Sequence, residues 1–204
     1  LTELPDERTQ FTLGMYGDGD FFTMKGVVEE FFEKAGLDGR ITYDPEDKKS
    51  FLHPGRQADI IYDGVKVGYL GEVHPQVCEN YNIGDRVYYA DIDMPYIVEH
   101  ACFDKKYEGI AKFPTSTRDI SLVVDKQVLI GTMENAIIKK GGKLLESCEL
   151  FDIYEGEQVG ESKKSVAFSL VFRAKDRTLS DTEISEIMDK ILAELTGLGA
   201  VLRQ

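Results

Sequence analysis

The sequence predicts an α+β fold whose second half is a small mixed domain. Apolar residues alternate with polar or small ones near Ile120–Val124, Leu150–Tyr154 and Ser165–Phe172, which is the period of half-buried strands. A helical stretch separates the first two strands, a second helical stretch follows the third strand, and Ala200–Arg203 supplies a last strand. The resulting order is strand, helix, strand, strand, helix, strand, or βαββαβ.

In such a split arrangement both helices pack on one face of the sheet, so alternate strand residues are predicted to be covered or open. The residues predicted to be covered are all apolar: Ile120, Leu122, Val124, Phe151, Ile153, Val166, Phe168, Leu170 and Phe172. The residues predicted to be open are mostly small or polar: Ser121, Val123, Asp152, Tyr154, Ser165, Ala167 and Ser169. This face leaves room for a flat ligand.

Tyr154 is the aromatic side chain of the predicted open face. Sheets of this topology bind single-stranded RNA by stacking a base on an exposed ring and reading its edge with nearby polar groups, here Ser121 and Ser165. A tyrosine that ends an edge strand also serves simply to cover the core while its hydroxyl stays in water. The pattern alone leaves both readings open.

Both helices of the second half have apolar residues at helical spacing. The first is predicted over Leu129–Lys140 and ends at Gly141-Gly142. The second begins with a capping box, in which Ser180 and Glu183 satisfy each other's backbone N–H groups.

The first half predicts a strand over Phe11–Gly14 and an amphipathic helix over Phe21–Ala35, capped by Asp20 and Gly36. Asp63-Gly64 between two strand-like runs is typical of a two-residue hairpin turn. Further elements are predicted as strands over Arg40–Tyr43 and Arg86–Met94, a short helix that begins at Pro75, and another over Pro95–Glu99.

Charge divides the 204 residues unequally. Residues 1–104 carry a net charge of −12 and residues 105–204 a net charge of −1, which together give −13. The acidic half is expected to repel nucleic acid, and the nearly neutral half has no basic stripe to supply strong phosphate attraction. Pro114 and the polar stretch before it place the predicted boundary near residue 104.

No catalytic or metal-binding motif emerges. His53, His74 and His100 lack the close pairing of a zinc site, so no metal is predicted. Cys78, Cys102 and Cys148 are expected to be reduced, buried thiols in the cytoplasm, and no run is apolar enough to span a membrane. The most distinctive polar cluster of the first half, His53–Arg56, fits either an anion-binding arginine or a tight turn whose arginine pairs with a nearby acid.

Several motifs in order resemble the C-terminal end of the bacterial phenylalanine–tRNA ligase beta subunit family. They are Asp20–Gly26, His53–Arg56, Gly68–Pro75, Arg118–Ile120, Leu150–Tyr154 and Arg177–Leu179. The resemblance implies that residues 1–104 are the C-terminal part of a catalytic-like, non-catalytic domain related to class II synthetases. It implies that residues 105–204 are a ferredoxin-fold anticodon-binding domain.

The resemblance also implies partners and site residues. The expected partners are the anticodon region of tRNA(Phe) and the alpha subunit, in an α2β2 enzyme whose alpha subunit attaches phenylalanine with ATP and magnesium. This chain is expected to hold no cofactor and no catalytic residue. Tyr154, Ser121 and Ser165 match the family's anticodon contacts, and the predicted phosphate contacts nearby are Arg118, Lys163, Lys164, Arg173 and Arg203.

Two other classes of function remain. One is a purely structural module that docks on the rest of a synthetase through its acidic first half and has no affinity for RNA. The other is a small enzyme on the ferredoxin-like fold, such as an acyl phosphate hydrolase, for which only Arg118 suggests an anion-binding loop.

Overall fold

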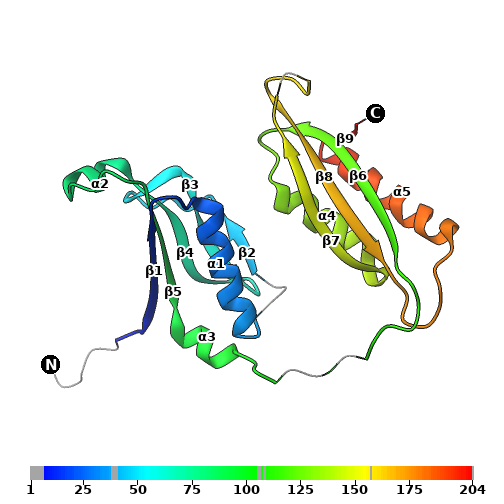
Figure 1. The fold of residues 1–204 in the computed structure, drawn as a ribbon, viewed down its shortest axis with the longest axis horizontal. Coiled ribbons are helices and arrows are strands. Elements are labelled where there is room, and N and C mark those ends of the chain that lie inside the picture. The colour runs from blue at the N-terminus through cyan, green and yellow to red at the C-terminus, as the bar shows by residue number, and fades with distance from the viewer. Residues whose placement is uncertain (1–6, 38–40, 105–106, 108, 157, 204) are drawn as a thin grey trace. The chain divides into compact units, whose positions relative to one another are not determined.

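The computed structural model describes residues 7–37, 41–104, 107, 109–156 and 158–203 (Figure 1). The chain divides into two compact units, Leu1–Tyr107 and Glu108–Gln204. This division falls close to the boundary predicted near residue 104. Each unit has its own cluster of buried apolar side chains.

The described part of the first unit contains one antiparallel sheet in the order β1-β5-β4-β3-β2. Its strands are β1 (Gln10–Tyr16), β2 (Ile41–Asp44), β3 (Leu52–Tyr62), β4 (Val65–Val73) and β5 (Val87–Asp93). Its helices are α1 (Phe21–Lys34), α2 (Pro75–Asn80) and α3 (Met94–His100). Helix α1 covers one face of this sheet (Figure 1), and its Met24, Val28 and Phe32 are buried in the core.

Local sequence signals formed as predicted in this unit. Asp20 caps α1 by accepting a hydrogen bond from the Thr23 N–H at 2.7 Å. Asp63 and Gly64 have φ values of 51° and 80°, which the predicted hairpin turn requires. Strand β3 begins at Leu52, and its pairing with β4 is irregular between Leu52 and Gln57.

The second unit has the predicted βαββαβ order, so the α+β prediction is confirmed. Its elements are β6 (Ser116–Asp125), α4 (Ile130–Gly141), a single 3-10 turn (Gly142–Leu144), β7 (Leu145–Tyr154), β8 (Lys163–Phe172), α5 (Asp181–Gly197) and β9 (Val201–Leu202). The strands form an antiparallel sheet in the order β7-β8-β6-β9, with α4 and α5 on one face (Figure 1). The predicted capping box of α5 is present, with Ser180 and Glu183 as its two members.

The predicted pattern of covered residues was wrong for Phe151 of β7, and Ile153 lies on the predicted face, opposite Val166, but is only partly covered at this edge strand. Phe151 is 56% exposed and Ile153 is 47% exposed, whereas the covered residues of β6 and β8 are buried. The pairing of β7 with β8 shifts between Leu150 and Asp152, so Phe151 is the extra residue of a β-bulge. Cys148 and Leu150, which precede the bulge, pack against the core instead.

The cysteines also differ from expectation. All three are free thiols, but only Cys78 is buried and Cys102 is exposed. Partial burial raises the pKa of the Cys148 thiol to about 11, which keeps this thiol protonated at neutral pH.

Candidate nucleic-acid interface

The face of the second sheet opposite α4 and α5 presents small and polar side chains. We call it the open face, and its residues are Asp119, Ser121, Val123, Asp152, Tyr154, Ser165, Ala167 and Ser169. Cross-strand pairing sets their positions: Tyr154 and Val123 both lie opposite Ser165, while Asp152 and Ser121 both lie opposite Ala167. The short side chains leave the Tyr154 ring as the large aromatic group of this face among the described residues.

Tyr154 is 36% exposed, and the end of its side chain lies against Gly156. A Cβ atom on Gly156 would lie 2.4 Å from the Tyr154 hydroxyl oxygen and 2.7 Å from its Cζ atom. Glycine is therefore the residue that lets the ring take this position beside the loop between β7 and β8.

Ser121, Ser165 and Arg203 are connected by hydrogen bonds next to this ring. The Ser121 and Ser165 Oγ atoms are 3.4 Å apart, and Ser165 is only 3% exposed. The Arg203 backbone N–H donates to the Ser121 carbonyl at 2.9 Å, and its guanidinium donates to the Ser165 Oγ at 3.3 Å. The guanidinium carbon lies 5.8 Å from the centroid of the Tyr154 ring, and a second N–H donates to the Gln158 Oε1 at 3.3 Å.

The structure therefore brings three of the six predicted site residues together, and it places the other three elsewhere. Lys164 lies opposite Val124 on the helix-covered side and is 8% exposed. Its ammonium donates to the Lys126 carbonyl at 3.2 Å, and burial lowers its pKa. Arg118, opposite the buried Leu170, also lies on that side and pairs with Asp181 at 2.8 Å.

Arg173 is close to the open face but distant from the ring. It follows β8 and pairs with Glu146 at 2.9 Å. A strand rises about 3.3 Å per residue, which separates Arg173 from Ser165 by about 26 Å. Lys163, at the exposed start of β8, lies opposite Asp125 near the ring end of the sheet. One nucleotide stacked on Tyr154 therefore cannot also reach Arg173 at the other end of the sheet.

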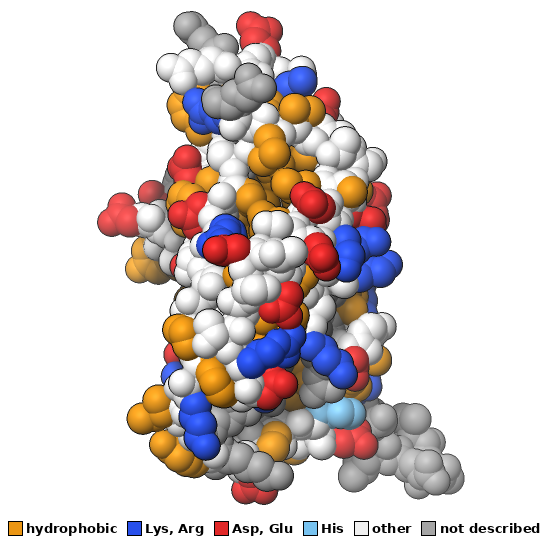
Figure 2. Space-filling model, turned by 90° about the vertical axis from the view of Figure 1, so that its right-hand side faces the viewer, with side chains coloured by type: hydrophobic (Ala, Val, Ile, Leu, Met, Phe, Trp, Pro, Cys, Tyr) orange, Lys and Arg blue, Asp and Glu red, His pale blue; other side chains and the backbone are white. Residues whose placement is uncertain are grey.

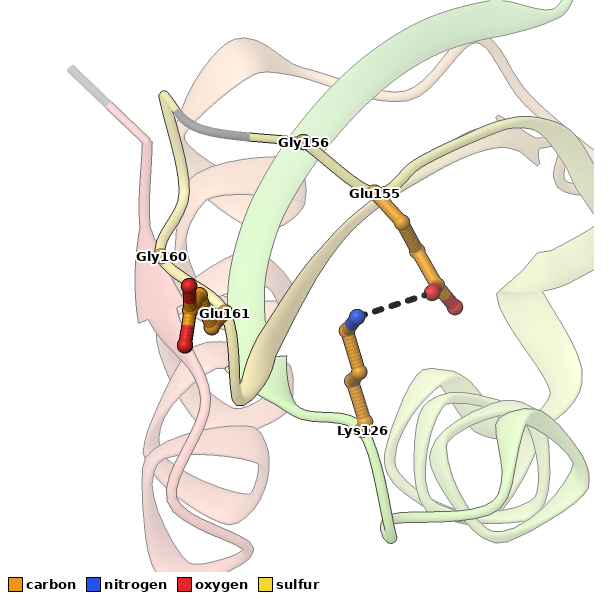
Figure 3. A pocket seen from close by; sticks show the side chains of 5 residues that line it. All are labelled: Lys126, Glu155, Gly156, Gly160 and Glu161. Atoms are coloured by element: carbon orange, nitrogen blue, oxygen red, sulfur yellow. Dashed lines mark ion pairs between the residues drawn. The ribbon is translucent and has the colours of Figure 1, made fainter.

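A hollow of about 460 Å³ adjoins the Tyr154 end of the sheet and is lined by Lys126, Glu155, Gly156, Gly160 and Glu161. Figure 3 shows Lys126 and Glu155 pointing toward one another, and their charged groups are 3.1 Å apart. The remaining carboxylate, that of Glu161, gives this hollow a negative character. A phosphate group is not favoured there.

Acidic and basic side chains alternate over the surface seen in Figure 2, and no continuous basic band crosses this view. The near-neutral charge of the second half agrees with this distribution. Any attraction of this surface for RNA therefore depends on a few positioned groups.

The sequence did not predict that Arg203 contacts Ser165, Gln158 and the Tyr154 ring. Gln158 was not among the predicted site residues. Arg203 was predicted only as one of several phosphate contacts. Its partner Ser165 is 38 residues earlier in the chain and Gln158 is 45 residues earlier. The available signal was that a strand ending at Leu202 must pair with a neighbour, which brings the following residue onto the sheet.

The polar residues of the first unit pair mainly with one another. Arg56 donates to both carboxylate oxygens of Glu72 at 3.0 and 2.9 Å, so this arginine pairs with an acid on the neighbouring strand. In the described part of the chain, no group of three or more His, Cys, Asp and Glu side chains is placed to hold a metal ion. Within the same residues, no helix is long and apolar enough to cross a membrane.

The second unit has the fold and the open polar face of a ferredoxin-fold anticodon-binding domain. The family described as "Ferredoxin-fold anticodon binding domain" matches residues 111–203, and that described as "Phenylalanyl tRNA synthetase beta chain CLM domain" matches residues 1–94. The chain belongs to the phenylalanine–tRNA ligase beta subunit family.

Curated relatives carry the same description. The phenylalanine–tRNA ligase beta subunit of Clostridium acetobutylicum is 45% identical over 202 residues, which cover 98% of this chain and 25% of that protein. That of Clostridium tetani is 41% identical over 98% of this chain, again 25% of the relative. That of Bacillus licheniformis is 40% identical over 86% of this chain and 22% of the relative. The chain spans about a quarter of the length of these relatives.

Proposed function

We propose that the open face binds a base of the tRNA(Phe) anticodon and thereby supports the attachment of phenylalanine to tRNA. The observation that carries this proposal is the Tyr154 ring, held by Gly156 at the open face beside Ser121 and Ser165. Any of the four nucleobases can stack on such a ring, and the neighbouring polar groups then distinguish the bases by hydrogen bonds to the base edge. The role assigned to this chain is recognition, without a catalytic residue.

Asp152 is the group best placed to read the base. It is exposed, lies on the same face of β7 as Tyr154, and is about 7 Å from it along the strand. A carboxylate accepts two hydrogen bonds, and the pairing edge of guanine presents an N–H and an amino group as donors. The proposed site therefore prefers guanine to adenine.

The chemistry of aminoacylation is assigned to other parts of the enzyme. ATP and magnesium would be used by the alpha subunit, with which the beta subunit would form an α2β2 heterotetramer. This assignment rests on the family relationship.

Tyrosine substitutions test the stacking. Tyr154→Ala is expected to weaken binding of a tRNA(Phe) anticodon stem-loop about 5- to 150-fold, because stacking contributes about 1–3 kcal/mol per base. Tyr154→Phe keeps the ring and is expected to change the affinity less than threefold. Binding is measured by titration of the chain with labelled stem-loop over a salt series, and an altered anticodon serves as the specificity control.

Gly156→Ala tests the position of the ring without removing it. The added methyl group would displace the end of the Tyr154 side chain, so the fold should persist while the affinity falls less than in Tyr154→Ala. Unchanged affinity in both Tyr154→Ala and Gly156→Ala would rule out stacking at this site.

A purely structural role is the second candidate, and the internal pairing of Arg118, Arg173 and Lys164 favours it because these cations are already engaged. It predicts no binding of either stem-loop at moderate salt. Equal, strongly salt-dependent binding of both would instead indicate phosphate attraction alone.

A further inference from the structure

Arg203 extends across the groups that a stacked base would use. Its backbone is fixed beside β6, because β9 pairs with that strand and the Arg203 N–H donates to the Ser121 carbonyl. Its guanidinium reaches past β6 to Ser165 on β8 and to Gln158 in the loop after β7. Ser165 is almost fully buried, with 3% of its surface exposed.

The bonds that hold this guanidinium are weak for an arginine. Both acceptors are neutral and both distances are 3.3 Å, at the long end for a hydrogen bond. The other arginines of the second unit, Arg118, Arg173 and Arg177, each pair with a carboxylate. Among the described residues, no carboxylate pairs with Arg203.

We propose that Arg203 makes the open face selective for nucleotides that carry an anionic phosphate. In the free chain the guanidinium lies over the Tyr154 ring and donates to the Ser165 hydroxyl. When a nucleotide stacks on Tyr154, Arg203 exchanges its two neutral acceptors for the phosphate, and the Ser165 hydroxyl becomes available to the base. This inference rests on the proposed stacking function and specifies the ligand class of the same site.

Moving the Arg203 guanidinium away from its two neutral acceptors is favourable when a phosphate takes their place and unfavourable when none does. A charge-assisted bond from arginine to phosphate is about twice as strong as a bond to a neutral acceptor. A base without an adjacent anion would have to displace Arg203 with no replacement for its lost partners. The acidic hollow lined by Glu155 and Glu161 disfavours a phosphate beside the β7–β8 loop, which leaves the β9 side for it.

The test replaces single phosphates of the anticodon loop by neutral methylphosphonate linkages, one at a time. For the unmodified chain, one linkage next to the stacked base is expected to weaken binding about tenfold, in line with the loss of one charge-assisted contact. Arg203→Met is expected to bind the charged and neutral probes within twofold of each other. It should also bind the neutral probe at least as tightly as the unmodified chain does, since no guanidinium has to be displaced.

Lys190→Met provides the matched control. It removes one exposed positive charge from α5, which packs on the covered face, and should leave the tenfold discrimination intact. Gln158→Ala removes one acceptor without changing Arg203, so it is expected to leave the affinity for the charged probe equal or slightly higher. Backbone amide spectra of each variant establish that the second unit remains folded.

The outcomes separate this inference from the proposed function. If Arg203→Met discriminates as the unmodified chain does while Tyr154→Ala still weakens binding, the role of Arg203 is overturned and the stacking function stands. A loss of affinity in Gln158→Ala would also overturn it. If the unmodified chain binds no stem-loop, the stacking function falls and the phosphate selectivity falls with it.

Discussion

The two sheets of this chain differ in how the polar side chains beside them are satisfied. In the first unit, Asp59 has a side chain that is only 6% exposed, and its carboxylate pairs with Lys49 and Lys66, each at 2.6 Å. In the second unit, the side-chain hydrogen bonds of Arg203 to described residues go to two neutral acceptors, each at 3.3 Å. A polar cluster closed by strong pairs resists a ligand, whereas weak neutral bonds can be exchanged for one.

Gln57 strengthens this contrast. It is 5% exposed, its Oε1 accepts from the Lys49 N–H at 2.7 Å, and its amide donates to the His53 carbonyl at 3.2 Å. Buried polar groups with all their partners stabilise one conformation. The polar cluster of the first unit therefore has a structural role, and this contrast supports the open face of the second unit as the proposed ligand site.

The largest expected effect tests whether the two units are separate in stability. Phe32 and Phe168 are both fully buried, one in each apolar cluster. Phe168→Ala is expected to lower the free energy of unfolding of the second unit by about 3–5 kcal/mol, and Phe32→Ala that of the first unit by a similar amount. Amide hydrogen exchange measures each unit separately, and the unchanged unit is the control. If either variant lowers protection in both units equally, the two units unfold together and the comparison fails.

The next effect tests the polar groups directly. Lys49→Met leaves the Asp59 carboxylate with one lysine instead of two and should destabilise the first unit by about 2 kcal/mol. Arg203→Met removes only weak neutral bonds from an exposed side chain and should change the stability of the second unit by less than about 0.5 kcal/mol. Urea unfolding followed by hydrogen exchange checks both values. Equal losses in the two variants would remove the distinction between a closed and an exchangeable polar cluster.

The sequence predicted features that depend on neighbouring residues. The Asp63-Gly64 turn, the caps of α1 and α5 and the βαββαβ order all follow from local patterns. Alternation in β6 and β8 also placed Ser121 and Ser165 correctly on the open face. The same alternation, applied to Arg118 and Lys164, puts them beside Ile120 and Val166 on the covered face, where the structure has them.

Features that depend on residues far apart in the chain could not be predicted from the sequence. The bulge at Phe151 arises from the register of β7 against β8, and Phe151 as the extra residue is left out of the core. The contacts of Arg203 join the end of the chain to a loop and a strand far earlier in the sequence. Neither the register nor these contacts leaves a local pattern.

The smallest expected effect concerns the acidic member of the α5 capping box. The Ser180 backbone N–H and then Arg177 stabilise the Glu183 carboxylate and lower its pKa from the ordinary 4.5 to about 2. Because the folded-state pKa is the lower one, this carboxylate stabilises the second unit fully above pH 4.5, and the contribution is lost as the pH falls toward 2. In α1 of the first unit, Thr23 rather than a glutamate takes the corresponding position.

Glu183→Gln is therefore expected to be slightly less stable than the unmodified chain at pH 7, with the difference disappearing between pH 4.5 and 2. Hydrogen exchange of α5 amides over this pH range provides the measurement. Glu186→Gln, which changes an exposed glutamate of the same helix outside the capping box, is the control and should parallel the unmodified chain. Near pH 2 the Glu183 carboxyl becomes neutral and resembles the glutamine amide, so a cap that depends on charge should lose its advantage there. A stability difference for Glu183→Gln that persists undiminished at pH 2 would mean that the shape of the side chain, rather than its charge, makes this cap effective.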